Sequence, residues 1–394
     1  MLRLLALFAF AGALSAQEEP ALEWHDLDGG LKVMPLSAAP GADWSAWKGP
    51  WVRPAGIAQA RPVQGPDVAH LELGEAGSLD VEVLGGSETH LLVRGPGRAD
   101  LDIPIETLRQ VEFKARRVGT ALPEPPAAGD RLYRLVGEVL DKVDGVLMGF
   151  SDQGVLFDTS LGDRVFAWGE VVHLYIEPLE EPQPVDGTEA LVDLHGGGML
   201  RGVLRSIDAT GIELGSGFGT WKVPYAWIRE MALLDGSFRY LTWLTPEASE
   251  APRSPFDAPD SPPLGMVWPM RVDRSVTGDL LRAGGRVWSH GLGVHAPSRL
   301  RWKLDGGDCW LRLTAGLEDS AVRGDQAGTV RFSVWVDGKE VWDSGLRRGG
   351  EATLTPDPIA LKDAKVLELV VSDGGDGPIL DRAAWLSPLL IRCR

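Results

Sequence analysis

Alternating hydrophobic and polar residues dominate the C-terminal part of the chain. The clearest alternating or apolar runs, each bounded by turn residues, are 309–314, 330–336, 366–371 and 389–391. Asp337-Gly338 predicts a tight hairpin turn between the second run and a strand at 340–342. Many short strands separated by turns are typical of a β-sandwich. We therefore predict that residues 237–394 form an all-β domain of this kind.

A second strand pattern repeats three times between residues 68 and 234. Aligned on their last strands, the copies place Leu108, Val171 and Ile228 at corresponding positions, so each copy is a small domain rather than a solenoid turn. Short strands, glycine-containing turns and a glycine at the bend (Gly149, Gly202) predict small closed barrels similar to Sm-like or SH3-like barrels. The predicted repeats are 67–116, 130–178 and 187–235, with proline-rich linkers between them.

The N-terminus has the pattern of a secretory signal peptide. Arg3 precedes an almost wholly apolar run, and small residues end it at Ser15-Ala16. The run is too short to span a bilayer comfortably and no other stretch approaches that length, so we expect an exported, not membrane-spanning protein in the periplasm, the cell envelope or the medium. The following segment, 17–66, is rich in proline and carries Trp24, Trp44, Trp47 and Trp51. These tryptophans are interpreted as anchors onto a neighbouring domain, with a sugar-stacking platform as the alternative.

Charge is distributed unevenly along the chain. Residues 1–235 carry 19 Lys+Arg against 35 Asp+Glu, whereas residues 236–394 carry 20 against 21. An acidic front half disfavours nucleic acid as a partner, because nucleic acid binds basic surfaces. We also find no glycosidase carboxylate pair that stands out, no nucleophile elbow, no zinc-protease motif and no phosphate loop, so the sequence favours a protein that is not an enzyme.

The stretch Trp288–Trp302 carries the densest set of polar candidates. His290 and His295 flank Gly291 and Gly293, and an alternating strand follows Pro297, which predicts a strand entered through a glycine-rich turn. The run His-Gly-Leu-Gly-Val-His-Ala, together with motifs at 316–319, 330–338, 367–377 and 381–385, resembles the NPCBM family of carbohydrate-binding modules, which occur attached to glycoside hydrolases. The resemblance covers about residues 237–393.

The resemblance implies a jelly-roll sandwich like that of galactose-binding modules, with Phe238–Leu244 as its first strand and a loop at 246–263. The alternative is that 246–263 is a linker and that the domain starts at Val267. The resemblance also allows the last strand to lie beside an earlier one. Cys309 and Cys393 would then form a disulfide, and two separate thiols are the alternative. Loops at one end of the sandwich would bind a galactose-like sugar or a complex glycan. The candidate carbohydrate-binding residues, each with a structural role as its alternative, are Trp268, Arg274, His290, His295, Glu318, Asp319, Arg323, Asp325 and Trp385.

The acidic, glycine-rich loop 372–377 suggests a metal site. Asp373, Asp376 and Asp381 offer carboxylates for a structural calcium ion, although such turns are commoner without metal. The sequence also departs from the resembled family at this point. Relatives show Asp-His-x-Asp-Trp, whereas this chain has Asp381-Arg-Ala-Ala-Trp385. Any ligand or metal role of the missing histidine and aspartate is therefore weakened here.

Three functional hypotheses follow from the sequence. The first is an exported, non-catalytic protein whose sandwich binds carbohydrate and whose barrels act as spacers or protein-contact modules. The second is a cell-envelope assembly protein whose sandwich binds other proteins. The third is a glycoside hydrolase with an unrecognised site in the N-terminal region.

Overall fold

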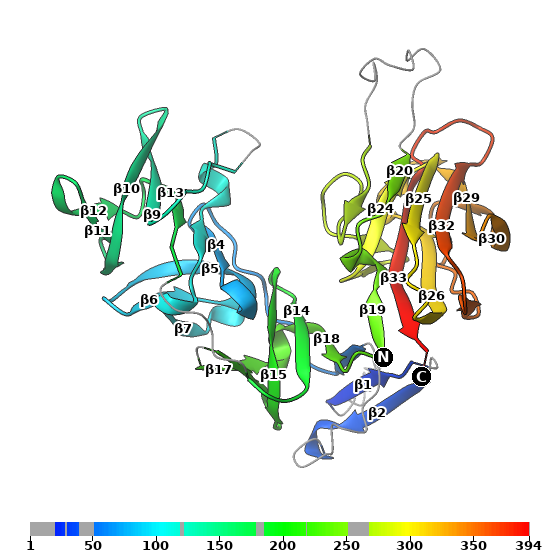
Figure 1. The fold of residues 1–394 in the computed structure, drawn as a ribbon, viewed down its shortest axis with the longest axis horizontal. Coiled ribbons are helices and arrows are strands. Elements are labelled where there is room, and N and C mark those ends of the chain that lie inside the picture. Colours follow the sequence, from blue (N-terminus) through cyan, green and yellow to red (C-terminus); the bar gives the residue numbers. More distant parts are fainter. Residues whose placement is uncertain are drawn as a thin grey trace, which may run out of the picture. The chain divides into compact units, whose positions relative to one another are not determined.

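The computed structural model describes residues 20–27, 30–38, 51–118, 122–178, 185–217, 219–250 and 268–393. Over these ranges the protein is all-β, as predicted, with short 3₁₀ turns between strands (Figure 1). None of the helical turns in these ranges has the length and apolar character needed to cross a membrane. The chain divides into two compact units, Met1–Ala232 and Leu233–Arg394, each described separately below.

Three antiparallel strands begin the first unit. They are β1 (Ala21–His25), β2 (Leu31–Pro35) and β3 (Trp51–Ala55), with the turn η1 (Leu36–Ala38) after β2. β1 pairs with both β2 and β3. Trp24 is half-buried on β1, and Lys32 Nζ lies 4.5 Å from its ring centroid. Trp44, Trp47 and the side chain of Trp51 lie outside the described residues, so an anchoring role for this tryptophan set stays a prediction.

The rest of the first unit contains three five-stranded segments with the same strand order. In each segment the first strand pairs with the second and the fifth, the second with the third, and the third with the fourth. The segments also pair with one another through β8–β13 and β5–β15. Closure of each segment into a separate barrel stays a prediction.

The strands of the first segment are β4 (Val68–Glu72), β5 (Gly77–Gly86), β6 (His90–Arg94), β7 (Asp100–Pro104) and β8 (Gln110–Glu112). Those of the second are β9 (Asp130–Val136), β10 (Val139–Phe150), β11 (Gly154–Thr159), β12 (Gly162–Ala167) and β13 (Val171–Tyr175). Those of the third are β14 (Glu189–Leu194), β15 (Gly198–Ile207), β16 (Gly211–Ser216), β17 (Gly219–Pro224) and β18 (Ile228–Leu234). The intervening turns are η3 (Gly74–Ala76), η4 (Pro96–Arg98), η5 (Ile105–Thr107), η6 (Lys114–Arg116) and η7 (Tyr225–Trp227).

A β-bulge interrupts the second strand of every segment. The register shifts between Val83 and Gly85, between Leu147 and Gly149, and between Leu204 and Ser206. Gly149 has a φ of 144°, and a Cβ there would lie 2.7 Å from a backbone carbon of the neighbouring segment, so glycine is required. In the third segment the skipped residue is Arg205, so a bend at Gly202 stays a prediction.

The second unit is a β-sandwich (Figure 1). One sheet has the order β21-β24-β33-β26-β31, with β19 also pairing with β33, and the other has the order β20-β25-β32-β29-β30. The first sheet is built from β19 (Phe238–Tyr240), β21 (Arg271–Val272), β24 (Gly291–His295), β26 (Asp308–Leu317), β31 (Ile359–Ala360) and β33 (Arg382–Arg392). The second is built from β20 (Ala248–Glu250), β25 (Ser298–Lys303), β29 (Thr329–Val336), β30 (Lys339–Arg348) and β32 (Val366–Asp373).

Two small ribbons and two 3₁₀ turns complete the second unit: β22 (Arg282–Ala283) with β23 (Arg286–Val287), β27 (Val322–Arg323) with β28 (Gln326–Ala327), η8 (Leu241–Trp243) and η9 (Asp319–Ala321). The predicted hairpin turn is confirmed, because Asp337 (φ 48°) and Gly338 (φ 80°) join β29 to β30.

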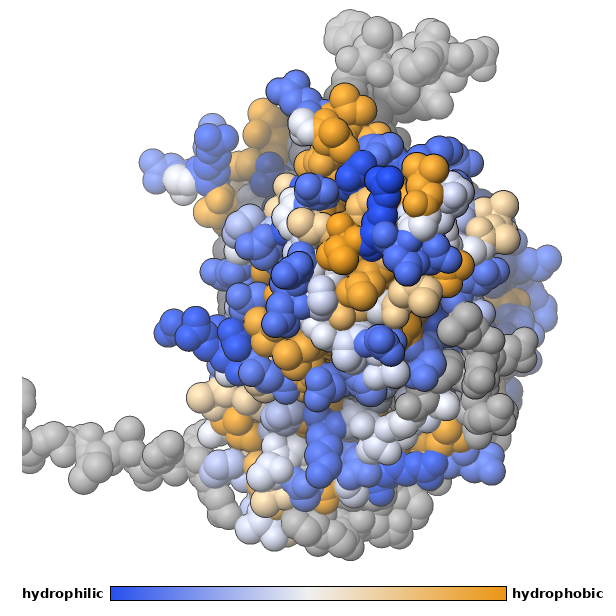
Figure 2. Space-filling view, turned by 90° about the vertical axis from the view of Figure 1, so that its left-hand side faces the viewer, coloured by the Kyte–Doolittle hydropathy of each residue, from blue (hydrophilic) through white to orange (hydrophobic). Residues whose placement is uncertain are grey.

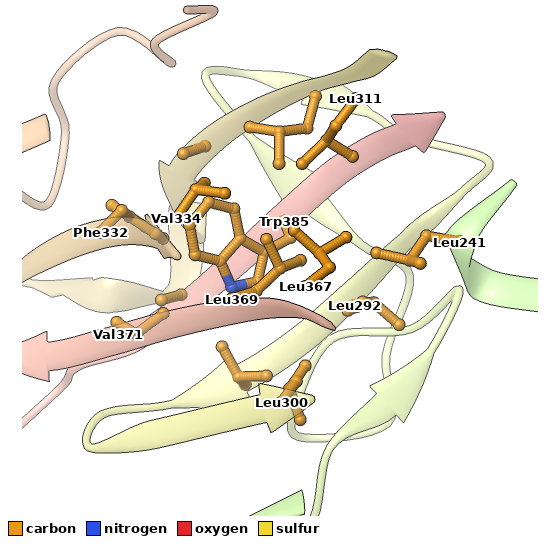
Figure 3. Packing of buried hydrophobic residues seen from close by; sticks show 14 of the residues in the cluster. Leu241, Leu292, Leu300, Leu311, Phe332, Val334, Leu367, Leu369, Val371 and Trp385 are labelled. Carbon is orange, nitrogen blue, oxygen red and sulfur yellow. The ribbon is translucent and has the colours of Figure 1, made fainter. Parts of the chain in front are cut away.

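Inward-facing side chains of the two sheets form one core (Figure 3). Leu292, Leu311 and Trp385 come from one sheet, and Leu300 and Phe332 from the other; all five are buried. Each alternates with outward residues along its strand, which is the pattern that the sequence showed. Apolar burial of this kind is the main stabilising contribution to the sandwich.

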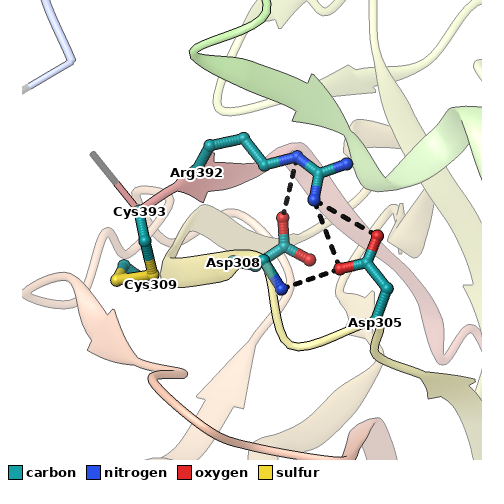
Figure 4. Close-up of a disulfide and its surroundings, with 6 residues drawn as sticks. Asp305, Asp308, Cys309, Arg392 and Cys393 are labelled. Atoms are coloured by element: carbon teal, nitrogen blue, oxygen red, sulfur yellow. Dashed lines mark hydrogen bonds and ion pairs between the residues drawn. A yellow bond between two sulfur atoms is a disulfide. The ribbon is translucent and has the colours of Figure 1, made fainter.

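A disulfide joins Cys309, near the start of β26, to Cys393, just after β33 (Figure 4). The two Cα atoms are 4.9 Å apart and 84 residues separate them in the sequence. Arg392 Nη1 lies 3.2 Å from both carboxylate oxygens of Asp305. The disulfide and the Arg392–Asp305 ion pair therefore both stabilise the region where β26 begins and β33 ends.

Candidate functional site

Three loops leave the sandwich at one end because of the register of β24, β26 and β33. His295, the last residue of β24, pairs with Arg382, the first residue of β33. Leu317, the last residue of β26, pairs with Ala383. The loops that begin or end at these positions are 296–297, 318–328 and 374–381. Segments that are distant in the sequence therefore come together here, and we call this end the loop end.

An aromatic and cationic cluster lies at the loop end. The rings of Trp268 and His295 stack with centroids 5.4 Å apart and planes 10° apart, and Arg382 Cζ lies 5.9 Å from the Trp268 ring. Trp268 and Arg382 are half-buried, whereas His295 is 6% exposed. The Nδ1–H of His295 donates to the carbonyl oxygen of Ala296 at 2.8 Å. Burial lowers the pKa of His295, so a neutral imidazole supports the indole.

The sequence indicated Trp268 and His295 but missed Arg382. Arg382 stands where relatives of the resembled family carry histidine. This difference from the family motif could have indicated Arg382 as a candidate site residue. Its guanidinium Nη1 donates to the carbonyl oxygen of Ser320 at 3.2 Å, which brings the η9 turn next to Trp268. The site therefore has a planar aromatic group, a fork of hydrogen-bond donors and an adjacent polar turn.

Glu318 holds the loop end together from within. It is 1% exposed, accepts a hydrogen bond from the Val276 amide at 3.0 Å and from the Ser320 hydroxyl at 3.0 Å, and also accepts one from the Ser275 hydroxyl. Burial raises the pKa of Glu318, although these hydrogen bonds act to lower it. Its prediction as a ligand contact is wrong, because its oxygens are enclosed and used to join the 318–328 loop to residues 275–276.

Four other predicted residues lie on the surface. Asp319 is exposed in η9 and accepts the Gly285 amide at 3.1 Å. Arg323 is exposed in the β27–β28 ribbon, and Asp325 is exposed in the turn of that ribbon. Arg274 is exposed beside Ser275, whose hydroxyl binds Glu318. All four are accessible to a ligand, and a binding role for them stays a prediction.

Trp385 does not reach the surface, which corrects its prediction as a sugar contact. The ring centroid of His290 lies 3.9 Å from that of Tyr240 and its Nδ1 lies 3.4 Å from Asp273 Oδ2, and a binding role for His290 stays a prediction. Trp385 is 0% exposed and meets Phe332 edge-on in the core, with centroids 5.1 Å apart (Figure 3). Sequence alone could not separate such a buried position from an exposed one, because aromatic residues serve both the core and binding surfaces.

The acidic loop does not assemble a tight carboxylate cluster. Asp373 and Asp376 are exposed, whereas Asp381 is fully buried with Oδ1 accepting the Thr329 amide at 2.9 Å. Burial, with the negative charges of Asp376 and Asp373 nearby, raises the pKa of Asp381 to about 7. In the described part of the chain, the oxygens of these three carboxylates do not all lie within 4.8 Å of one another. A calcium site therefore stays a prediction.

The fold and the loop end define the second unit as a β-sandwich with a loop-borne candidate ligand site. Comparison with known proteins places this domain more closely. Residues 259–391 match the model of the NPCBM/NEW2 domain, which confirms the family resemblance seen in the sequence. A segment of 119 residues is 33% identical to part of alpha-1,3-galactosidase B of Akkermansia muciniphila; it covers 29% of this chain and 14% of that enzyme.

Solved structures of CBM51 carbohydrate-binding modules are also similar to the chain. One is the CBM51 module from Clostridium perfringens GH95 in complex with methyl-galactose, with 22% identity, 39% of this chain and 99% of that chain covered, and a TM-score of 0.33. Another is the tandem CBM51 pair of a family 98 glycoside hydrolase from Streptococcus pneumoniae SP3-BS71, with 15% identity, 66% and 88% covered, and a TM-score of 0.32.

Proposed function

We propose that the chain is an exported, non-catalytic protein whose second unit binds carbohydrate at the loop end. The observation that carries this proposal is the half-buried Trp268, stacked on His295 next to Arg382. A sugar needs a flat apolar surface for its C–H groups and fixed polar groups for its hydroxyls. The indole supplies the first, and the Arg382 guanidinium with the Asp319 carboxylate supplies the second.

The NPCBM/NEW2 match supports the ligand class, and the segment shared with alpha-1,3-galactosidase B supports galactose-terminated glycans as the first ligands to test. In this proposal the strand segments of the first unit act as spacers or protein-contact modules outside the cell. Their acidic composition is consistent with solubility and disfavours nucleic acid. Binding of envelope proteins in place of glycans is the alternative that the experiment must separate.

A glycan array probed with the full-length protein, with calcium supplied, tests the proposal. Substitution Trp268→Ala should weaken binding at least about tenfold, because it removes the partly exposed indole that would cover the C–H groups of the sugar. Trp310→Ala is the matched control: Trp310 is a 46% exposed tryptophan of the same sandwich, on β26 near the disulfide, and its loss should leave binding unchanged.

Two results would overturn the proposal. Absence of binding to every glycan by the folded wild-type protein would reject the carbohydrate function and favour the assembly alternative. Equal binding by the wild type and the Trp268→Ala variant would reject the site.

A further inference from the structure

A cavity of about 650 Å³ lies in the first unit, whereas the loop end and its proposed glycan site belong to the second. Its walls are Arg109 and Gln110 at the start of β8, the extended segment 122–129, and residues 175–178 at the end of β13. The volume is within the range of small-molecule and side-chain binding sites. The NPCBM/NEW2 match does not include this part of the chain.

The 122–129 segment is fixed in place by hydrogen bonds, so the cavity is preformed. The Tyr175 hydroxyl donates to the carbonyl oxygen of Pro123 at 2.6 Å, and the Tyr133 hydroxyl donates to that of Glu124 at 2.7 Å. Prolines at 123, 125 and 126 restrict the backbone to an extended conformation. A ligand would therefore enter without ordering this wall, which lowers the entropic cost of binding.

Many hydrogen-bond donors of the lining are absent or already engaged. Four of the lining residues are prolines and have no N–H. The Ile176 amide donates to the Arg109 carbonyl at 2.9 Å, and the Glu177 amide donates to Asp130 Oδ1 at 2.7 Å. The Arg109 guanidinium donates to the carbonyl oxygens of Glu106 and Leu108, each at 2.7 Å. The lining therefore offers more acceptors than free donors.

Two carboxylates are the strongest polar groups that remain. Glu124 is exposed on the 122–129 segment, and Glu177 is exposed among the lining residues 175–178. Glu177 uses one oxygen, Oε2, to accept the Gly129 amide at 2.8 Å, which fixes the side chain and leaves Oε1 for a ligand. Residues 1–235 as a whole carry 35 acidic against 19 basic side chains, so the surrounding field attracts cations.

We propose that this cavity binds a cationic group rich in hydrogen-bond donors, a guanidinium or an ammonium. The two glutamates would pair with the charge, and the backbone carbonyls of Pro126, Ala127 and Ala128 would accept the remaining N–H groups, because those of Pro123 and Pro125 already accept from Tyr175 and Arg131. The same chemistry occurs in an arginine side chain of a peptide and in a free polyamine, so both are tested.

Titration calorimetry at low salt with the full-length protein tests this site. The probes are N-acetyl-arginine amide, its uncharged isostere N-acetyl-citrulline amide, and spermidine. We expect binding of at least one cationic probe and at least about tenfold weaker binding of the citrulline compound. Binding of the arginine amide alone assigns the site to a peptide side chain, and binding of spermidine alone assigns it to a free amine.

The double variant Glu124→Gln/Glu177→Gln should weaken binding at least about tenfold, because it keeps the shape of the cavity and the acceptor for Gly129 while removing both charges. Glu88→Gln/Glu138→Gln is the matched control, since it removes the same charge from two exposed turns that do not line the cavity. The proposal is overturned if no cationic probe binds, if citrulline binds as well as arginine, or if the control pair weakens binding as much as the site pair.

Discussion

Asp381 shows how the surroundings of one side chain change its chemistry. Its carboxyl is fully buried and its pKa is raised to about 7, with one oxygen accepting the Thr329 amide. Between about pH 4 and pH 7 the folded protein therefore holds a proton that the unfolded chain has lost. Stability should fall as the pH rises through this window and then level off, by an amount on the order of a few kcal/mol.

Substitution Asp381→Asn should remove this pH dependence, because asparagine still accepts the Thr329 amide but cannot ionise. Urea unfolding at several pH values between 4 and 8 measures it. If the free energy of unfolding of the variant changes with pH as much as that of the wild type, another group causes the pH dependence. Added calcium gives a second readout: if Asp381 holds the ion, calcium stabilises the wild type near pH 8 and leaves the variant unchanged.

Residue types alone indicated three residues that the structure places at the loop end, Trp268, His295 and Asp319. Their role in binding stays a prediction. The sequence could not show that Glu318 and Trp385 are buried, because that depends on which strand face meets the second sheet. An acidic or aromatic residue beside a loop has the same appearance in the sequence whether it closes the core or faces solvent.

The positions of strands along the sequence were more predictable than the pairing of one strand with another. The alternating runs at 309–314, 330–336 and 366–371 are strands, and the Asp337-Gly338 hairpin forms as expected, because side-chain periodicity and turn chemistry are local properties. The pairing of β8 with β13 and of β5 with β15 links separate repeats. Such pairing depends on exposed strand edges meeting in three dimensions, and no local pattern encodes it.

The Cys309–Cys393 disulfide connects the ends of two neighbouring strands, β26 and β33. It closes a loop with a sequence separation of 84, so it restricts the unfolded chain strongly. Replacing both cysteines with serine should lower the free energy of unfolding of the sandwich by about 2–4 kcal/mol. Urea unfolding with and without reductant checks this: reductant should destabilise the wild type and leave the double variant unchanged. Equal stability of the two oxidised proteins would contradict it.

The two proposed sites belong to different units of the molecule. The glycan site lies at the loop end of the sandwich, whereas the cation site lies among the strands of an acidic unit. Figure 2 shows apolar side chains among the polar ones on one face of the protein. In the second five-stranded segment, five apolar side chains are at least half exposed, which is consistent with a role in contacts to other proteins: Val139, Val146, Met148, Leu161 and Val165.

Hydrogen exchange of the full-length protein, with and without the glycan that binds most tightly on the array, tests the central claim most directly. Our account predicts that the glycan slows exchange in peptides covering 268–270, 295–298, 318–323 and 382, and leaves peptides of the first unit unchanged. Slowed exchange confined to the first unit, or to the disulfide end of the sandwich, would contradict it.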